Sequence, residues 1–362
     1  MRIARTVTGR SLIVAFSGSY HGIIDEVLVR GSKKLMTFPA APGIMPESVQ
    51  NMLILEYGTE ESLRIITERA DELAAVLVEP VQSRRPEFQP IDFLNDLRAL
   101  TTKADIALIF DEVITGFRMH PGGLQTLFNI KADLATYGKV IGGGLSIGAI
   151  AGKRKYMDAL DGGFWQYGDD SIPEVGVTYF AGTFVRHPLA LAASKASLLH
   201  LKKQGPALQN RLNEMTSQLA SELNTEFKKK GLPMVINHFG SLWRLKFNDD
   251  VLYGELLFTL LRENGIHIWD GFPCFLTEAY KEEDLTTIVS TFKKSIAKMV
   301  SAGFFFTNKP ESAISNQSGL NNSVIINKPP VNGAKLGRDI EGNPAWFVAD
   351  TDKKGEYVKI DL

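Results

Sequence analysis

The chain has 362 residues, of which 44% are hydrophobic, and its 40 Lys and Arg residues nearly balance its 41 Asp and Glu residues. This size is sufficient for a large core and for more than one folding unit. The balanced charge argues against nucleic-acid binding, and no apolar run approaches the ~20 residues that cross a bilayer, so no membrane role is expected.

A single cysteine, Cys274, is present in the sequence. One cysteine forms neither an internal disulfide nor a cysteine metal cluster, so no metal is expected. The first residues are basic but lack the apolar core of a secretory signal. These features together predict a cytoplasmic protein.

The first predicted strand is the apolar run Leu12–Phe16, and the turn SGSYHG (residues 17–22) follows it. In open α/β sheets, ligands bind beyond the carboxyl ends of the strands. Tyr20 and His21 are therefore candidate ligand contacts. The alternatives are a surface tyrosine and a structural histidine, which are both common.

A helix is predicted over Glu60–Ala70 and a buried strand over Ala74–Val78, which ends at Glu79. The sequence VQSRRPEFQP follows that strand end. Its Arg84 and Arg85 favour an anionic or phosphorylated ligand, because arginine binds carboxylate and phosphate groups bidentately. A solvated basic pair is an equally good interpretation.

The next elements are a helix over Ile91–Lys103 and a strand over Ile106–Phe110 that Asp111 ends. The alternation of strand, helix and strand predicts a mostly parallel α/β sheet with right-handed crossovers. Asp111 would then point into a site at the carboxyl edge of that sheet. An ordinary polar strand end is the alternative.

Lys139 follows Asp111 by 28 positions (139 − 111) in the glycine-rich stretch YGKVIGGGLSIG. A phosphate-binding P-loop has its glycines before the lysine and Ser or Thr after it, which is not the order here. A lysine in a tight apolar turn has a lowered pKa, which favours Schiff-base chemistry. An exposed structural lysine is the alternative.

The rest of the chain predicts a smaller α/β unit. The pattern indicates strands and helices over the following ranges: a helix at Pro188–Gln204, an amphipathic helix containing Leu212 to Phe227, a strand at Ser241–Phe247, a helix at Leu252–Asn264, a strand at Gly265–Trp269 and a helix at Asp284–Val300. We expect a large domain at 1–188, a small C-terminal domain at 189–302 and a linker region at 303–362.

Four ordered motifs, SYHG, DEVITGFR, YGKVIGGGLSIGAIAG and YFAGTF, resemble those of the class III pyridoxal-phosphate (PLP) aminotransferases. Within this class the chain is similar to glutamate-1-semialdehyde aminomutases and to the aminotransferase domains of hybrid polyketide and nonribosomal peptide synthetases. The resemblance implies PLP-dependent transferase fold type I, with PLP as cofactor and a homodimer as the assembly.

The resemblance also implies roles for individual residues. Lys139 would link covalently to PLP, and Asp111 would pair with the pyridinium nitrogen. Tyr20 would stack on the ring, and Thr183 would reach the cofactor phosphate of the other subunit. The full set of cofactor contacts implied is Tyr20, His21, Glu79, Asp111, Val113, Lys139, Gly182 and Thr183. The candidate substrate contacts are Gln82, Arg84 and Arg85.

Both ends of the sequence carry further expectations. Members of the family have a long portion ahead of a sequence like that of residues 1–10, including a Ser-Gly turn that holds the cofactor phosphate, so the N-terminal part is expected to be missing. Residues 308–327 are rich in Ser and Asn and predict a linker. The segment after it resembles the one that precedes condensation domains.

The function that these features favour is an aminotransferase domain of a hybrid synthetase. By a ping-pong mechanism it would move an amino group from an amino-acid donor to a 3-oxoacyl thioester on an acyl carrier protein. One alternative is a stand-alone glutamate-1-semialdehyde 2,1-aminomutase. A second alternative is a non-catalytic interaction segment.

Overall fold

The computed structural model describes residues 1–32, 34–248, 251–304, 334–338, 344–349 and 357–360. Contacts divide the chain into two compact units, 1–308 and 309–362. In the described part of the chain, no helix is long and apolar enough to span a membrane.

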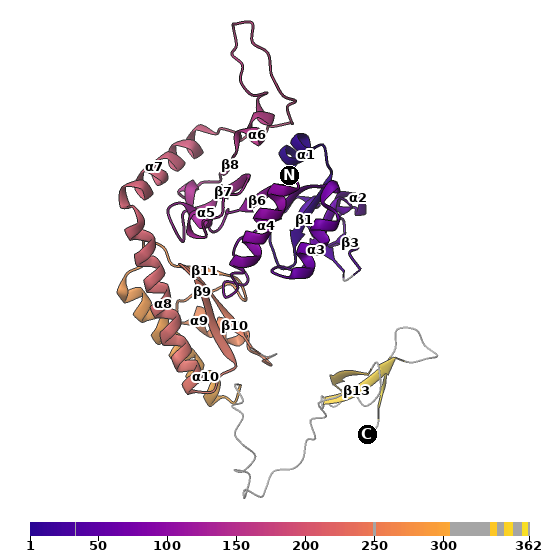
Figure 1. The fold of residues 1–362 in the computed structure, drawn as a ribbon. Helices are drawn as coiled ribbons and strands as arrows, with labels where there is room; N and C mark the ends of the chain where they lie inside the picture. Colours follow the sequence, from indigo (N-terminus) through magenta and orange to yellow (C-terminus); the bar gives the residue numbers. More distant parts are fainter. Residues whose placement is uncertain (33, 249–250, 305–333, 339–343, 350–356, 361–362) are drawn as a thin grey trace, which may run out of the picture. The chain divides into compact units, whose positions relative to one another are not determined.

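A six-stranded sheet forms the centre of the first unit (Figure 1). Its strands lie in the order β4 (Met52–Leu55), β1 (Leu12–Phe16), β5 (Leu73–Val78), β6 (Ala107–Asp111), β7 (Leu134–Gly138) and β8 (Gly148–Gly152). All neighbours pair in parallel except β7 and β8, which are antiparallel. Every residue of β1 and β5 is buried, as expected for strands covered on both faces. The predicted mostly parallel α/β sheet is confirmed.

Helices cover both faces of this sheet. On one face lie α3 (Glu60–Glu68) and α4 (Ile91–Lys103), whose apolar side chains join those of β1 and β6 in one cluster. On the other face lie α1 (Arg2–Thr8), α6 (Arg154–Met157) and the 3-10 helix η4 (Asp158–Leu160). The helix predicted at Ile91–Lys103 is confirmed at the same bounds.

Short elements connect these layers. They are η1 (Asp25–Val27), β2 (Val29–Gly31), β3 (Thr37–Pro39), α2 (Pro46–Val49), η2 (Ala70–Glu72), α5 (Gly123–Leu127) and η3 (Lys139–Gly142). Strands β2 and β3 form a small antiparallel ladder.

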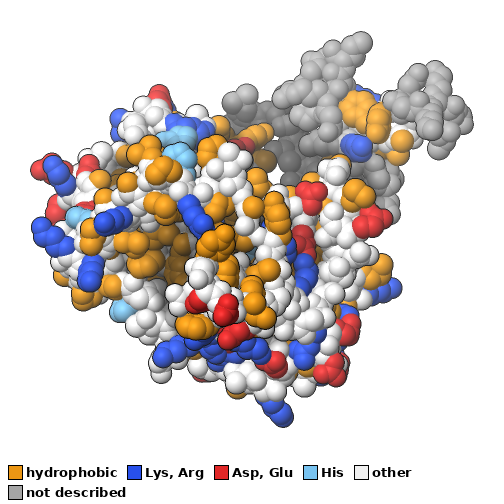
Figure 2. Space-filling view, turned by 90° about the horizontal axis from the view of Figure 1, so that it is seen from above, with side chains coloured by type: hydrophobic (Ala, Val, Ile, Leu, Met, Phe, Trp, Pro, Cys, Tyr) orange, Lys and Arg blue, Asp and Glu red, His pale blue; other side chains and the backbone are white. Residues whose placement is uncertain are grey.

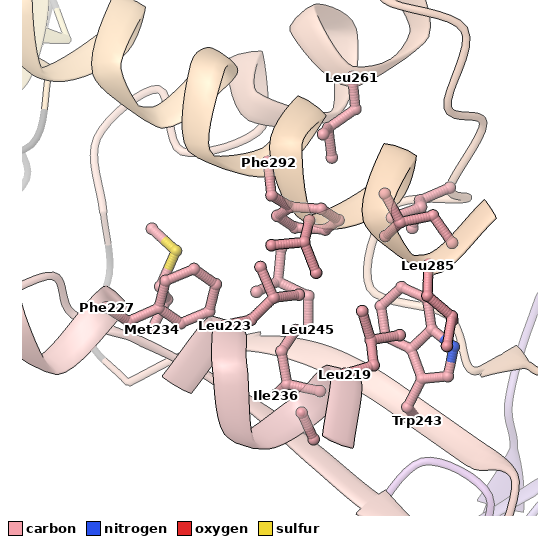
Figure 3. Close-up of a cluster of buried hydrophobic side chains, with 14 of the residues drawn as sticks. Leu219, Leu223, Phe227, Met234, Ile236, Trp243, Leu245, Leu261, Leu285 and Phe292 are labelled. Atoms are coloured by element: carbon pink, nitrogen blue, oxygen red, sulfur yellow. The ribbon is translucent and has the colours of Figure 1, made fainter. Parts of the chain in front are cut away.

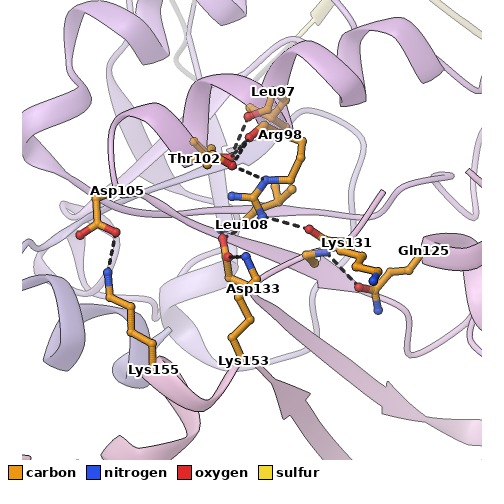
Figure 4. Close-up of polar contacts among 12 residues, drawn as sticks. Leu97, Arg98, Thr102, Asp105, Leu108, Gln125, Lys131, Asp133, Lys153 and Lys155 are labelled. Atoms are coloured by element: carbon orange, nitrogen blue, oxygen red, sulfur yellow. Dashed lines mark hydrogen bonds and ion pairs between the residues drawn. The ribbon is translucent and has the colours of Figure 1, made fainter. Parts of the chain in front are cut away.

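Asp133 anchors the start of the β7–β8 hairpin (Figure 4). Its carboxylate accepts the Leu108 N–H at 2.8 Å and pairs with Arg98 at 2.9 Å and Lys153 at 2.7 Å. Burial would raise the pKa of Asp133, but the bonds from Lys153, Leu108 and Arg98 hold it below its ordinary value. The network joins α4 and β6 to the open end of the hairpin, where β7 begins and β8 ends.

The remaining elements of the first unit form a smaller α/β layer. They are α7 (Pro188–Gln204), α8 (Pro206–Lys229), β9 (Met234–Phe239), β10 (Leu242–Phe247), α9 (Leu256–Glu263), β11 (Cys274–Phe275) and α10 (Glu282–Ser301). The three strands form an antiparallel sheet in the order β11-β10-β9. Figure 3 shows Phe292 and Leu285 of α10 in one buried cluster with Leu223 and Phe227 of α8.

The predicted strand at Gly265–Trp269 is wrong. No strand is present over those residues. Ile268 is buried, but Trp269 is 67% exposed and stacks on Phe272, with ring centroids 3.8 Å apart. The strand that actually pairs with β10 is the two-residue β11, which follows this segment. The apolar residues of this segment are therefore accounted for without a strand, because Ile266 and Ile268 pack on the core and Trp269 stacks on Phe272.

The second unit contains the antiparallel strands β12 (Lys335–Arg338), β13 (Pro344–Ala349) and β14 (Tyr357–Lys359). The linker predicted at 308–327 lies outside the described residues. The domain boundary at 188 stays a prediction.

Candidate active site

Polar side chains follow the carboxyl ends of four strands that are neighbours in the sheet. Tyr20 and His21 follow β1, Glu79 follows β5, Asp111 ends β6, and Lys139 follows β7. The carboxyl ends of parallel strands meet at one edge of a sheet, so residues far apart in sequence are brought together there. The electrostatic coupling of Lys139 to both Asp111 and Glu79 agrees with this placement.

Asp111 is held by three donors. His21 Nδ1 donates to Oδ2 at 2.7 Å, while the Val113 N–H and the Thr136 hydroxyl each donate to Oδ1 at 3.2 Å. Burial would raise the pKa of Asp111, but the bond and charge of His21, with the other two donors, hold the pKa below its ordinary value. Asp111 is therefore an anion whose orientation is set by its neighbours.

Glu79 and Gln82 shape the turn that carries Tyr20. The buried Glu79 accepts the Tyr20 N–H at 2.9 Å and the Ser83 N–H at 3.4 Å. Gln82 Nε2 donates to the Ser17 carbonyl at 2.8 Å and to the Ser19 hydroxyl at 3.0 Å. Burial raises the pKa of Glu79, and the charge of Asp111 adds to that rise while His21 opposes it. Glu79 and Gln82 therefore hold the turn at residues 17–20 through hydrogen bonds to its backbone and to the Ser19 hydroxyl.

Lys139 begins the turn between β7 and β8 in an unusual backbone conformation. Its φ of 45° lies in the left-handed region, which a side chain other than glycine rarely adopts. Burial lowers the pKa of its amine, and the nearby charge of Arg118 lowers it further, while Asp111 and Glu79 oppose the shift. Among the described residues, none forms a hydrogen bond or ion pair with this amine. The lysine is therefore partly desolvated and available for reaction.

A cavity of about 580 Å³ lies against Lys139. Its lining comes from the loop after β6, from η3, from α7 and α8, and from the segments that precede β10 and follow β11. The cavity therefore lies between the large sheet and the smaller layer. Such positions between folding units are typical of ligand sites.

The structure separates the two arginines that the sequence grouped together. The Arg84 guanidinium lies 6.0 Å from the ring centroid of Tyr20 and 5.8 Å from that of Phe272. Arg85 instead lies 4.6 Å from the Phe88 ring centroid. Arg84 is therefore close to the candidate site, whereas Arg85 contacts a different aromatic ring.

Gly182 and Thr183 are not brought to this group of residues. Both are exposed and lie in the long segment between α6 and α7, which projects from the rest of the first unit in Figure 1. The nearby Tyr179 carbonyl accepts a hydrogen bond from Arg2 of α1 at 2.7 Å. Within this one chain, no described contact joins Thr183 to Lys139 or Asp111. Its predicted role needs a second copy of the chain.

Sequence reasoning missed Thr136 and Arg118. Thr136 lies on β7 directly opposite Asp111 of β6, so the register of the sheet makes it a donor to the carboxylate. Arg118 is the last residue of DEVITGFR, but the motif alone does not reveal that its side chain lines the cavity beside Lys139. The one signal available for Thr136 was its place in the predicted strand, three positions before Lys139.

The residues present fit a flat pyridine aldehyde such as PLP. The Asp111 carboxylate suits a protonated ring nitrogen, Lys139 suits the aldehyde, and the partly exposed Tyr20 ring offers a flat surface. In addition, His21 Nε2 and Gln82 Oε1 are buried without a hydrogen-bond partner, which leaves polar atoms for a bound group. The chemistry of this donor set therefore agrees with the cofactor expected from the sequence.

Comparison with known proteins supports this description. Residues 1–294 match the family model described as "Aminotransferase class-III". The chain is 34% identical over 319 residues to a glutamate-1-semialdehyde 2,1-aminomutase of Desulforapulum autotrophicum, covering 83% of this chain and 71% of that protein. It is 35% identical to glutamate-1-semialdehyde 2,1-aminomutase 2 of Brevibacillus brevis, covering 82% and 70%. A solved transaminase with PLP bound superposes with a TM-score of 0.73 at 28% identity, covering 83% of this chain and 70% of that one, which confirms the predicted fold.

Proposed function

This chain belongs to the class-III aminotransferase family and is a PLP-dependent enzyme of that fold, and we propose that Lys139 and Asp111 are its catalytic pair. One observation carries this assignment. An amine with a lowered pKa and a carboxylate fixed by three donors lie at the ends of adjacent strands and interact electrostatically. A reactive amine and a carboxylate that can hold a ring nitrogen protonated are the two groups that PLP-dependent amino-group transfer uses.

Bound PLP supplies the carbonyl group and the electron-accepting ring. The Asp111 carboxylate would hold the ring nitrogen in its protonated form, and His21 would keep that carboxylate oriented. The Lys139 amine would take up and give back the proton at the substrate Cα. Tyr20 would cover one face of the ring, and Val113 would support Asp111 through its N–H.

The amino-group exchange of a glutamate-1-semialdehyde 2,1-aminomutase is the first candidate reaction. The two relatives that share 34% and 35% identity with this chain carry that name. A cavity of about 580 Å³ between two layers is large enough for a five-carbon amino aldehyde. In this reaction the amino group moves within one small substrate.

Transfer from an amino-acid donor to a carrier-bound 3-oxoacyl thioester is the second candidate reaction. The exposed Arg84 beside Tyr20 favours it, because a guanidinium suits the phosphate of a phosphopantetheine arm. The resemblance of the segment after residue 327 to the one that precedes condensation domains also favours this reaction. Gln82 would contribute indirectly by holding the turn, and Arg85 would lie too far toward Phe88 to act with Arg84.

Mass spectrometry separates these two reactions. The PLP-loaded protein is incubated in parallel with glutamate-1-semialdehyde and with a 3-oxoacyl acyl carrier protein plus L-glutamate. The aminomutase proposal expects 5-aminolevulinate in the first reaction and an unchanged carrier in the second. Amination of the carrier, abolished by Arg84→Gln but not by Arg85→Gln, would favour the second proposal instead.

The assembly proposed is a homodimer, as is typical of the class. Large apolar side chains remain exposed on the segment that contains Thr183, and these include Phe164, Tyr167, Tyr179, Phe180 and Phe184. Figure 2 looks down on the side where this segment projects in Figure 1 and shows hydrophobic side chains among charged ones over that face. Exposed apolar patches are typical of interaction surfaces.

The dimer proposal predicts a particle of twice the 40.0 kDa chain mass by light scattering. Phe180→Asp combined with Phe184→Asp is expected to give the single-chain mass, because two charges cannot be buried in an apolar interface without partners. Gly182 and Thr183 would contact the phosphate of the other subunit in that dimer. A wild-type chain that stays at 40.0 kDa at high concentration would contradict the proposal.

A further inference from the structure

Arg118 lies in the cavity that Lys139 lines, on the loop that follows β6. Its guanidinium carbon is 4.1 Å from the ring centroid of Phe275, and its Nε donates to the Ile114 carbonyl at 3.1 Å. A ring on one side and a backbone bond at Nε hold the side chain in one orientation. Among the described residues, no hydrogen bond or ion pair uses the two terminal nitrogens.

The charge of Arg118 has no anionic partner in the described part of the chain. No Asp or Glu there lies within ion-pair distance of it, although Glu278 lines the same cavity. Glu278 is paired instead with His200, with Nε2 and Oε2 2.6 Å apart. Burial lowers the pKa of Arg118 to about 10, which reflects the cost of a buried cation without a counterion.

The residues around Arg118 also favour the binding of an anion in this cavity. Its charge acts on Lys139 and lowers the pKa of that amine, so two basic groups share one cavity. Two further lining residues, Gln209 and Ser241, have a side-chain oxygen that is buried without a hydrogen-bond partner. The cavity therefore contains unpaired positive charge next to polar groups without partners.

We propose that Arg118 binds the carboxylate of the substrate and so places the substrate Cα next to Lys139. The inference rests on the proposed function, in which Lys139 reacts with that substrate. A guanidinium with two free terminal nitrogens binds a carboxylate bidentately, which sets both distance and direction. Arg118 is thus a specificity-determining residue, and amines that lack a carboxylate would be excluded because they leave its charge unpaired.

The test measures binding without turnover, using glutarate and its neutral analogue glutaramide as probes of the PLP-loaded full chain. Titration calorimetry is expected to show that the wild type prefers glutarate. Arg118→Gln is expected to weaken glutarate binding by at least about tenfold and to leave glutaramide binding unchanged. Arg118→Lys keeps the charge but not the fork and is expected to give an intermediate preference for glutarate.

Arg154→Gln is the matched control, because Arg154 is an exposed arginine of α6 that pairs with Asp158. It is expected to bind glutarate as the wild type does. Circular dichroism melting curves show whether each variant is folded. If Arg118→Gln does not fold, the preference of Arg118→Lys for glutarate is measured in its place. Equal preference for the two probes in the wild type, or loss of glutarate binding in Arg84→Gln but not in the Arg118 variants, would overturn the inference.

Failure of the proposed function gives a different result. If Lys139 is not the reactive lysine, Lys139→Ala will retain amino-group transfer while the Arg118-dependent glutarate binding persists. If Arg118 alone is misassigned, Lys139→Ala will be inactive and Arg118→Gln will bind both probes as the wild type does.

Discussion

Lys139→Ala is expected to reduce amino-group transfer by roughly 10³-fold or more, because in the proposed function this one side chain supplies both the covalent attachment and the proton transfer. Among the described residues, no other lysine lines the cavity at the candidate site. The partly desolvated amine has no hydrogen-bond partner in the described part of the chain, so its replacement breaks no hydrogen bond or ion pair there. The fold is therefore expected to survive the change.

The measurement is the rate of amino transfer together with the visible absorbance of bound cofactor. Lys203→Ala is the control, because Lys203 is exposed near the end of α7. Borohydride reduction of the wild type followed by peptide mapping is expected to label the peptide that contains YGKVIGGG. Label on another lysine, or full activity in Lys139→Ala, would contradict the assignment.

The reactivity of Lys139 should also depend on pH in a defined direction. Burial lowers the pKa of its amine, so a larger neutral fraction is present just above neutral pH than in an exposed lysine. Labelling of Lys139 by an amine-reactive reagent is therefore expected to persist to lower pH than labelling of a free peptide lysine of ordinary pKa. Labelling of Lys139 is expected to stop when the pH falls below the lowered pKa of its amine, because the amine is then protonated.

Asp111→Asn is expected to slow amino-group transfer by roughly 10²- to 10³-fold while cofactor binding is largely retained. An amide has nearly the shape of the carboxylate, and its oxygen can still accept the bonds from Val113 and Thr136. It has no negative charge, so it cannot keep the ring nitrogen protonated, and negative charge that develops at the substrate carbon is less well stabilised.

Single-turnover kinetics and the cofactor dissociation constant test this prediction. A large decrease in rate with a small change in cofactor affinity is expected. Asp96→Asn is the control, because Asp96 lies exposed on α4. An unchanged rate in Asp111→Asn would exclude Asp111 as the residue that holds the ring nitrogen.

Sequence patterns predicted the buried strands and long helices well. The run Leu12–Phe16 forms β1 with the same bounds, and Pro188–Gln204 forms α7 with the same bounds. Strands covered on both faces need unbroken apolar runs, and such runs are visible locally. The strand predicted at Gly265–Trp269 was wrong because an alternating apolar pattern does not show whether a neighbouring strand is available for pairing.

The candidate site was predicted only in part. Asp111, Lys139, Glu79 and the turn with Tyr20 each follow a recognisable strand, so their meeting at one edge follows from the parallel sheet. The hydrogen bond from His21 to Asp111 spans 90 positions, and its existence depends on strand register and turn geometry. The two arginines of RRP were adjacent in sequence, but their side chains contact different rings.

By itself, the sequence determined the alternation of strands and helices and the family, and it singled out Lys139 and Asp111 as the proposed reactive lysine and its acid, because each depends on local pattern or on ordered motifs. Only the tertiary structure decided that Thr136 and His21 hold the acid, that Arg118 shares a cavity with Lys139, and that Thr183 lies apart from both. Contacts of this kind depend on how β6, β7 and α8 pack in space, and the energies of packing and charge pairing come from neighbours that are distant in the chain.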